Sequence, residues 1–167
     1  RSMLMVLFLK VTSVLFPSAT TVLSAGATAA SGIRQWDLRF LRQRHPQPIA
    51  TFHVPPAAKR RGFTSLSVDR TGTRLFAVST NGIVYEFSLA GQQSREPLRE
   101  LHGAEIAQCY FMDTAASPES DHLLGGSSNG QPLVWDIGAR RDESTILHPI
   151  CRLPHGDTEV TSVAWAD

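Results

Sequence analysis

The stretch Gly32-Ile-Arg-Gln-Trp-Asp37 recurs in altered form at Gly82-Ile-Val-Tyr-Glu-Phe87 and Pro132-Leu-Val-Trp-Asp136. Each copy is a short run rich in β-branched and aromatic residues, a composition typical of β-strands. The copies lie about fifty residues apart, and a regular spacing of this length is typical of proteins built from repeated structural units. The repeat therefore indicates a fold of about three similar units.

Three further short apolar runs accompany each copy. Turns rich in Gly, Ser, Asn, Asp and Pro separate the runs, and such turns reverse the chain without a crossover helix. We therefore expect antiparallel strands and an all-β fold, with no amphipathic helix. The expected strands are first runs at 11–16, 63–68, 106–111 and 160–165, second runs at 21–25, 74–79 and 122–126, and fourth runs at 48–54, 97–101 and 150–153.

Four strands per unit, with Trp-Asp closing the third, resemble the blades of the WD-repeat β-propeller family. The signature dipeptides here are Trp36-Asp37 and Trp135-Asp136. The resemblance implies about three four-stranded blades in an incomplete ring, because a closed propeller needs about four to eight. We expect an unmatched leader at 1–10, blades over about 11–54, 63–101 and 106–153, and the first strand of a further blade at 160–165.

Composition excludes several classes of protein. Of 167 residues, 42% are hydrophobic, which is enough for a packed core. The net charge of +1 creates no overall attraction to nucleic acid or membrane. Two cysteines, Cys109 and Cys151, supply no disulfide framework, and the six histidines show no metal-binding spacing. No phosphate-binding loop is present, so we expect neither a metal nor a cofactor.

An apolar stretch near the N-terminus is interrupted by Lys10, and neither part reaches the roughly 18 residues of a membrane helix. We therefore expect no membrane partner. A secretory signal cleaved near residue 30 is an alternative, but Lys10 and the absence of an Asn-x-Ser/Thr sequence oppose it. Because no methionine precedes Arg1, we expect the chain to be part of a longer protein.

One motif suggests an enzyme. The run 126–130 fits Gly-x-Ser-x-Gly, which in hydrolases exposes a nucleophilic serine, here Ser128, between a strand and a helix. The residues after it, 131–136, are an expected strand rather than a helix. We therefore interpret the motif as a turn and expect no catalytic activity, with a serine hydrolase as the enzymatic alternative.

Positive charge is concentrated between Arg34 and Arg61, where the sequence contains seven basic residues and a single acidic residue, Asp37. Within it, Lys59, Arg60 and Arg61 form a basic cluster that either contacts an acidic or DNA-bound partner or belongs to a solvated loop. Aromatic residues do not alternate with these basic ones closely enough for base stacking. We therefore expect no direct sequence-specific binding of nucleic acid.

The sequence Trp36-Asp37-Leu38-Arg39 carries the most specific functional signal. Trp-Asp-x-Arg resembles the motif by which WD-repeat substrate receptors dock on the adaptor protein of cullin-4 ubiquitin ligases. The resemblance implies that Trp36 packs within the blade, that Asp37 tethers the strand end by hydrogen bonding, and that Arg39 contacts the adaptor. The other Trp-Asp dipeptide is followed at the same spacing by Gly138 and lacks the motif.

A wider likeness to one branch of these receptors extends over residues 11–165 and is most specific at the motif 36–39 and in the long basic connection 39–62. It implies a nuclear, non-catalytic subunit of a cullin-4 RING ubiquitin ligase. Such a subunit recruits replication-linked or cell-cycle proteins, bound to the sliding clamp, for degradation. The alternative is a generic WD-repeat interaction scaffold outside the ubiquitin system.

Overall fold

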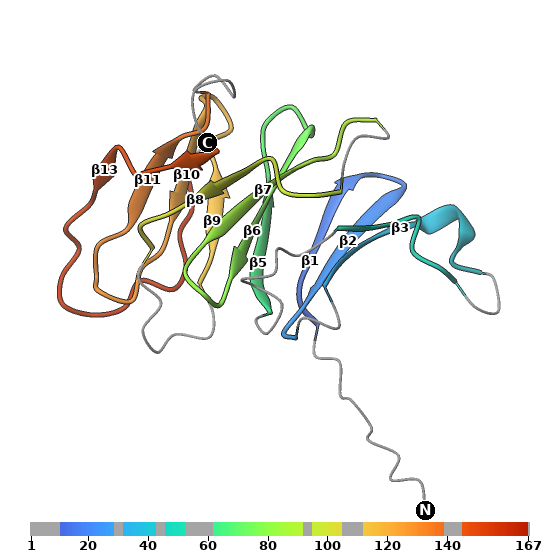
Figure 1. The fold of residues 1–167 in the computed structure, drawn as a ribbon, viewed down its shortest axis with the longest axis horizontal. Helices are drawn as coiled ribbons and strands as arrows, with labels where there is room; N and C mark the ends of the chain where they lie inside the picture. Colours follow the sequence, from blue (N-terminus) through green and yellow to red (C-terminus); the bar gives the residue numbers. More distant parts are fainter. Residues whose placement is uncertain are drawn as a thin grey trace, which may run out of the picture.

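The computed structural model confirms the expected all-β class. It describes residues 11–28, 32–42, 46–52, 62–91, 95–104, 112–138 and 145–166. In these residues the strands form three sheets that follow one another in space in chain order, as blades of an open ring do (Figure 1). The only helical element in the described part of the chain is one short 3-10 turn, η1 (Leu38–Phe40).

Each sheet contains an antiparallel run of four strands, and we call the three sheets the first, second and third blades. Their neighbour orders are β1-β2-β3-β4, β5-β6-β7-β8 and β9-β10-β11-β13. The bounds are β1 (Val11–Ser18), β2 (Thr21–Gly26), β3 (Ile33–Asp37) and β4 (Ala50–Phe52); β5 (Phe63–Val68), β6 (Arg74–Ser79), β7 (Val84–Ser88) and β8 (Arg99–Leu101); and β9 (Thr114–Ala116), β10 (His122–Gly125), β11 (Leu133–Asp136) and β13 (Cys151–Arg152).

The structure departs from the expected strands in two places near the C-terminus. The strand that pairs with β10 is β9, whereas the expected run 106–111 lies outside the described residues. The tight turn before β10, in which the Ser117 amide donates to the His122 carbonyl, fixes this pairing. The expected run 160–165 forms no strand in the structure, and its one bridge joins Val160 to Ser127. Its assignment to a further blade stays a prediction. No fourth sheet is present in the described chain to pair with this segment.

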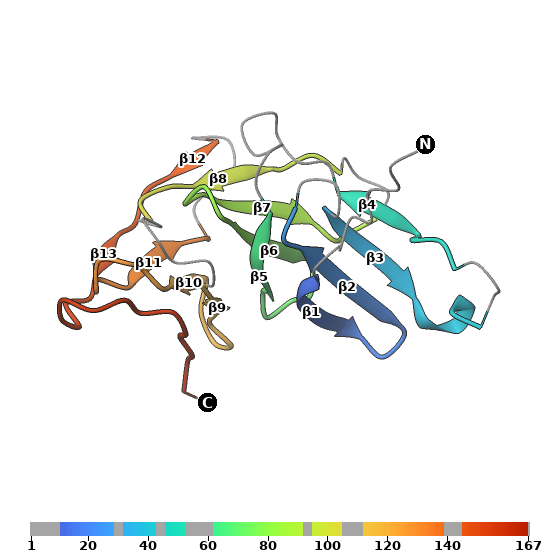
Figure 2. The same ribbon diagram turned by 90° about the horizontal axis from the view of Figure 1, so that it is seen from below.

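An additional strand joins the second blade from a distance in sequence. β12 (Ile146–Leu147) pairs parallel with β8, and the His102 amide donates to the Leu147 carbonyl. The connection between β11 and β13 thus crosses to the neighbouring blade, as Figure 2 shows. This crossing covers the outer edge of β8, and covering an edge strand hinders pairing with another chain.

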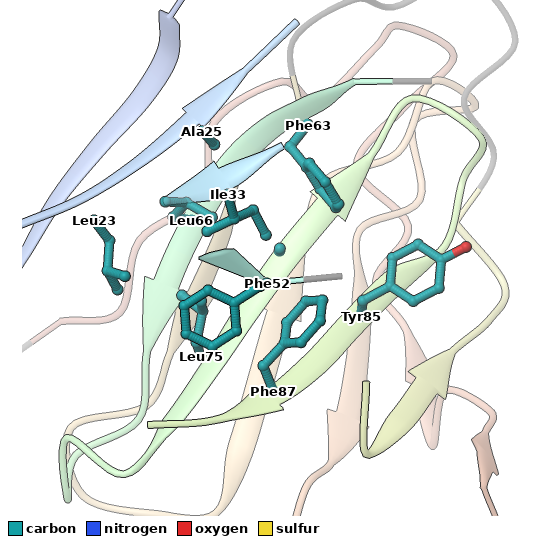
Figure 3. Packing of buried hydrophobic residues seen from close by; sticks show 10 residues of the cluster. Leu23, Ala25, Ile33, Phe52, Phe63, Leu66, Leu75, Tyr85 and Phe87 are labelled. Atoms are coloured by element: carbon teal, nitrogen blue, oxygen red, sulfur yellow. The ribbon is translucent and has the colours of Figure 1, made fainter. Parts of the chain in front are cut away.

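The second blade is buried on both faces. Leu75 and Phe87 point toward the first blade, where the Phe87 ring meets Phe52 edge-on with ring centroids 5.4 Å apart (Figure 3). Alternate residues point the opposite way, so Phe76 packs with Trp135 of the third blade. The two-residue period of a β-strand thus divides β6 and β7 between two separate cores.

Buried charge joins the second and third blades. Arg99 Nε donates to Glu86 Oε2 at 2.7 Å, and both side chains are almost fully buried. The guanidinium groups of Arg99 and Arg74 also donate to the Ile137 carbonyl, at 2.9 and 2.6 Å. Two cations from one blade therefore converge on the end of β11, which fixes how the blades are aligned.

The turn between β5 and β6 is organised by one buried carboxylate. Asp69 accepts hydrogen bonds from the Thr73 and Arg74 amides, both at 2.9 Å, from Arg74 Nε at 3.0 Å and from the Thr71 hydroxyl at 2.6 Å. Burial opposes ionisation of Asp69, but the hydrogen bonds from Thr71 and Arg74 outweigh it and hold its pKa below the usual value. Ionised Asp69 therefore stabilises the fold.

Replacing Phe87 with Ala should lower the free energy of unfolding by about 3–5 kcal/mol, because a fully buried ring leaves a cavity between two blades. Urea unfolding of the full natural protein measures the change. The matched control is Ile150→Ala, since that side chain is 61% exposed. Equal effects of the two substitutions would contradict the assigned packing.

Replacing Asp69 with Asn should lower the free energy of unfolding by about 2 kcal/mol at neutral pH, because charge-assisted hydrogen bonds are lost. The lowered pKa means that the stabilisation is present above about pH 4, the unfolded value, and is lost as the pH falls through the folded pKa. Unfolding curves at several pH values should show the gap between wild type and variant closing in acid. A gap independent of pH would contradict the assignment.

Candidate docking site at the rim

The candidate site lies where β3 ends and η1 begins, at the edge of the first blade farthest from the second (Figures 1 and 2). β3 pairs with β2 up to the Thr21–Asp37 position, and the Leu38 amide then donates to the Thr20 carbonyl. Asp37 has an extended backbone and is the N-cap of η1. Its Oδ1 accepts the Arg39 amide at 2.9 Å, so the chain turns away from the sheet at this residue.

The side chain of Arg39 is bound to the same carboxylate. Arg39 Nε donates to Asp37 Oδ1 at 3.0 Å and Nη2 to Oδ2 at 2.6 Å, which is a two-point contact. The Arg39 side chain nevertheless remains 67% exposed, whereas that of Asp37 is 9% exposed. A guanidinium has five N–H donors in a planar fork, so Arg39 is oriented by Asp37 and retains donors for a partner.

The two charges stabilise each other. The hydrogen bonds from Arg39 lower the pKa of Asp37 below its usual value, and the same contact raises the pKa of Arg39. Both groups are therefore charged throughout the neutral pH range. The contact sets the direction of the guanidinium and offsets its charge, and the remaining N–H donors of Arg39 are available because its side chain is 67% exposed.

Trp36 has a different environment from its counterparts in the other blades. Phe87 and Trp135 occupy the same register position, each opposite an aliphatic residue of the second strand, and are fully buried against the preceding blade. Trp36 lies opposite Val22 and is only half-buried, because it faces away from the second blade. Its Nε1 donates to Ser24 Oγ at 2.9 Å. The indole thus fastens β3 to β2.

The turn after the third strand is the same in all three blades. Asp37 accepts from the amide two residues later, and so do Ser88, from Ala90 at 3.2 Å, and Asp136, from Gly138 at 2.8 Å. Sequence reasoning missed Ser88, although its place one residue after an aromatic was the available signal. The rim residue is therefore Arg39, Ala90 or Gly138, and of these three only Arg39 carries a charge.

The match with known proteins covers nearly the whole chain. This chain is 34% identical over 159 residues to Denticleless protein homolog B of Xenopus laevis. It is 34% identical to the human Denticleless protein homolog and 30% identical to Protein lethal(2)denticleless of Drosophila melanogaster. Each match covers 93% of this chain. This chain is related to the Denticleless proteins. It spans about a fifth of their length, and no family model matches it.

The Denticleless proteins are the branch whose likeness the motif 36–39 and the connection 39–62 indicated, so this resemblance is confirmed. The basic cluster Lys59, Arg60 and Arg61 lies outside the described residues, and its contacts stay a prediction. Of the three motif residues, Asp37 and Arg39 bind each other at the end of β3, whereas the Trp36 indole bonds Ser24. Their role in docking stays a prediction.

The other described residues of this Denticleless-related chain that were candidates for catalysis or metal binding lie in turns or at sheet edges. Ser128 is in the turn between β10 and β11, and a strand follows, as expected. Cys151 is exposed on β13, whereas Cys109 lies outside the described residues. Within the described ranges, no group of three or more His, Cys, Asp and Glu could hold a metal ion. No helix there is long and apolar enough to cross a membrane.

Proposed function

We propose that this Denticleless-related chain belongs to the non-catalytic substrate-recognition subunit of a nuclear cullin-4 RING ubiquitin ligase. The observation that carries the proposal is Arg39, which is exposed at the rim and oriented by Asp37. The similarity to Denticleless proteins supports it, because the sequence motif of the same residues resembles the docking motif of such receptors.

The proposed partners follow from the same resemblance. The subunit docks on the adaptor of the cullin-4 ligase through Arg39, and it recruits replication-linked or cell-cycle proteins bound to the sliding clamp. Its contribution is proximity, because holding a substrate near a ubiquitin-charged partner replaces a bimolecular encounter with an effectively intramolecular one. The basic cluster Lys59, Arg60 and Arg61 is proposed as a contact for the substrate or for nearby DNA.

The geometry suits such a contact. An arginine fork matches the geometry of a carboxylate, and its orientation before binding reduces the entropy lost on docking. Asp37 is a positioning residue in this proposal, because its carboxylate is nearly buried and holds both the backbone and the side chain of Arg39. Trp36 supports the same strand end through Ser24.

Arg39→Ala should weaken adaptor binding by the full natural protein about tenfold or more, because a charge pair at an interface is lost. Quantitative co-purification from nuclei, followed by titration with purified adaptor, measures the loss. The matched control is Arg70→Ala, an exposed arginine in the turn between β5 and β6. If neither protein recovers the adaptor, the scaffold alternative replaces the receptor. If both recover it equally, the docking role of Arg39 is wrong.

Asp37→Asn should weaken adaptor binding less than Arg39→Ala, since the arginine is retained but loses its orientation. The double substitution should bind like Arg39→Ala alone, because residues that act through one contact are not additive. Circular dichroism of each variant checks that the sheet is intact. Independent, additive losses would show that Asp37 does not act through Arg39.

A further inference from the structure

Two large apolar side chains directly follow Arg39 and remain exposed. Phe40, the last residue of η1, is 52% exposed, and Leu41, its C-cap, is 42% exposed. No residue of η1 is buried. A single exposed apolar residue is ordinary on a protein surface. An exposed aromatic ring beside an exposed arginine matches the residue types enriched at protein interfaces, and Leu41 extends the apolar surface.

Phe40 and Arg39 form one surface. The guanidinium carbon of Arg39 lies 5.8 Å from the centroid of the Phe40 ring, within the range of a cation–π contact. Asp37 binds the same guanidinium. The arginine is thus fixed between a carboxylate and an aromatic ring, and we call Arg39, Phe40, Leu41 and Arg42 the rim patch.

The charge of the rim patch specifies its partner. Arg39 and Arg42 are exposed, whereas the carboxylate of Asp37 is nearly buried and engaged with Arg39. The exposed N–H donors of Arg39 and the positive charge of Arg42 therefore border the apolar centre of the patch. A complementary surface is an apolar pocket bordered by carboxylates. At the equivalent positions of the sequence the other blades have Ala90-Gly91-Gln92-Gln93 and Gly138-Ala139-Arg140-Arg141. Neither has large apolar residues at the positions of Phe40 and Leu41.

We propose that Phe40 and Leu41 insert into an acid-bordered apolar pocket of the ligase adaptor and form the apolar anchor of the contact that Arg39 orients. This inference rests on the proposed receptor function and adds the residues that supply its affinity. Charge attracts and aligns the two surfaces, and burial of the ring and the leucine slows dissociation.

The test measures binding of purified adaptor to the full natural protein carrying Phe40→Ser or Leu41→Ser. Each should weaken binding about fivefold to thirtyfold, as expected for central interface residues. Phe40→Leu should retain most of the affinity because it remains apolar. Ile150→Ser is the matched control, since Ile150 is an exposed apolar residue on the third blade.

Salt dependence separates the two contributions. Screening weakens the arginine contact and leaves apolar burial largely unaffected, so Arg39→Ala should flatten the decline of affinity with salt. Phe40→Ser and Leu41→Ser should lower affinity at every salt concentration and keep the slope. Equal thermal unfolding midpoints are required of all variants, and where Phe40→Ser shifts the midpoint, Leu41→Ser decides.

The outcomes distinguish this inference from the proposed function. If Arg39→Ala loses binding and both serine variants bind like wild type, the apolar anchor is wrong and the receptor stands. If the serine variants lose binding and Arg39→Ala does not, the anchor stands and the role of the arginine is wrong. If wild type does not bind the adaptor, both are wrong.

Discussion

The structure depends on the burial of the second blade between its two neighbours. β6 and β7 present Leu75 and Phe87 to one core and Phe76 to the other, so neither face of this sheet is available to solvent. The first and third blades pack against opposite faces of this central sheet. The rim of the first blade, which includes Arg39, therefore keeps its position because the first blade packs against the second.

Charge has two separate roles in this framework. The buried Arg99–Glu86 pair lies within the second blade, and Arg99 reaches the third blade through the Ile137 carbonyl. Breaking such a pair leaves an uncompensated buried charge. The Asp37–Arg39 pair lies at the surface instead, where it contributes little to stability. Its physical effect is orientation, because one carboxylate holds both the amide and the guanidinium of Arg39. This arrangement is consistent with the docking role proposed for Arg39.

The repeated turn after the third strand explains how one blade can carry the proposed docking residue, Arg39. The side chains of Asp37, Ser88 and Asp136 each accept a hydrogen bond from the backbone N–H two residues later. This backbone donor is therefore paired in every blade, whatever the residue that carries it. The residue that donates this amide is then free to vary, as Arg39 and Ala90 do. A structural repeat supplies equivalent positions, and side-chain chemistry at one of them supplies the specificity.

Alternation, turn residues and close spacing are local properties of a sequence. They were therefore enough to predict the all-β class, most strands of the three blades including the first strands β1 and β5, and the closeness of Asp37 and Arg39. Contacts between segments distant in sequence determine the position of β9 and the crossing of β12 to β8. Tertiary structure also decided that Phe40 is exposed beside Arg39. These features depend on which surfaces meet across distant segments, and an apolar residue in a sequence does not specify what will cover it.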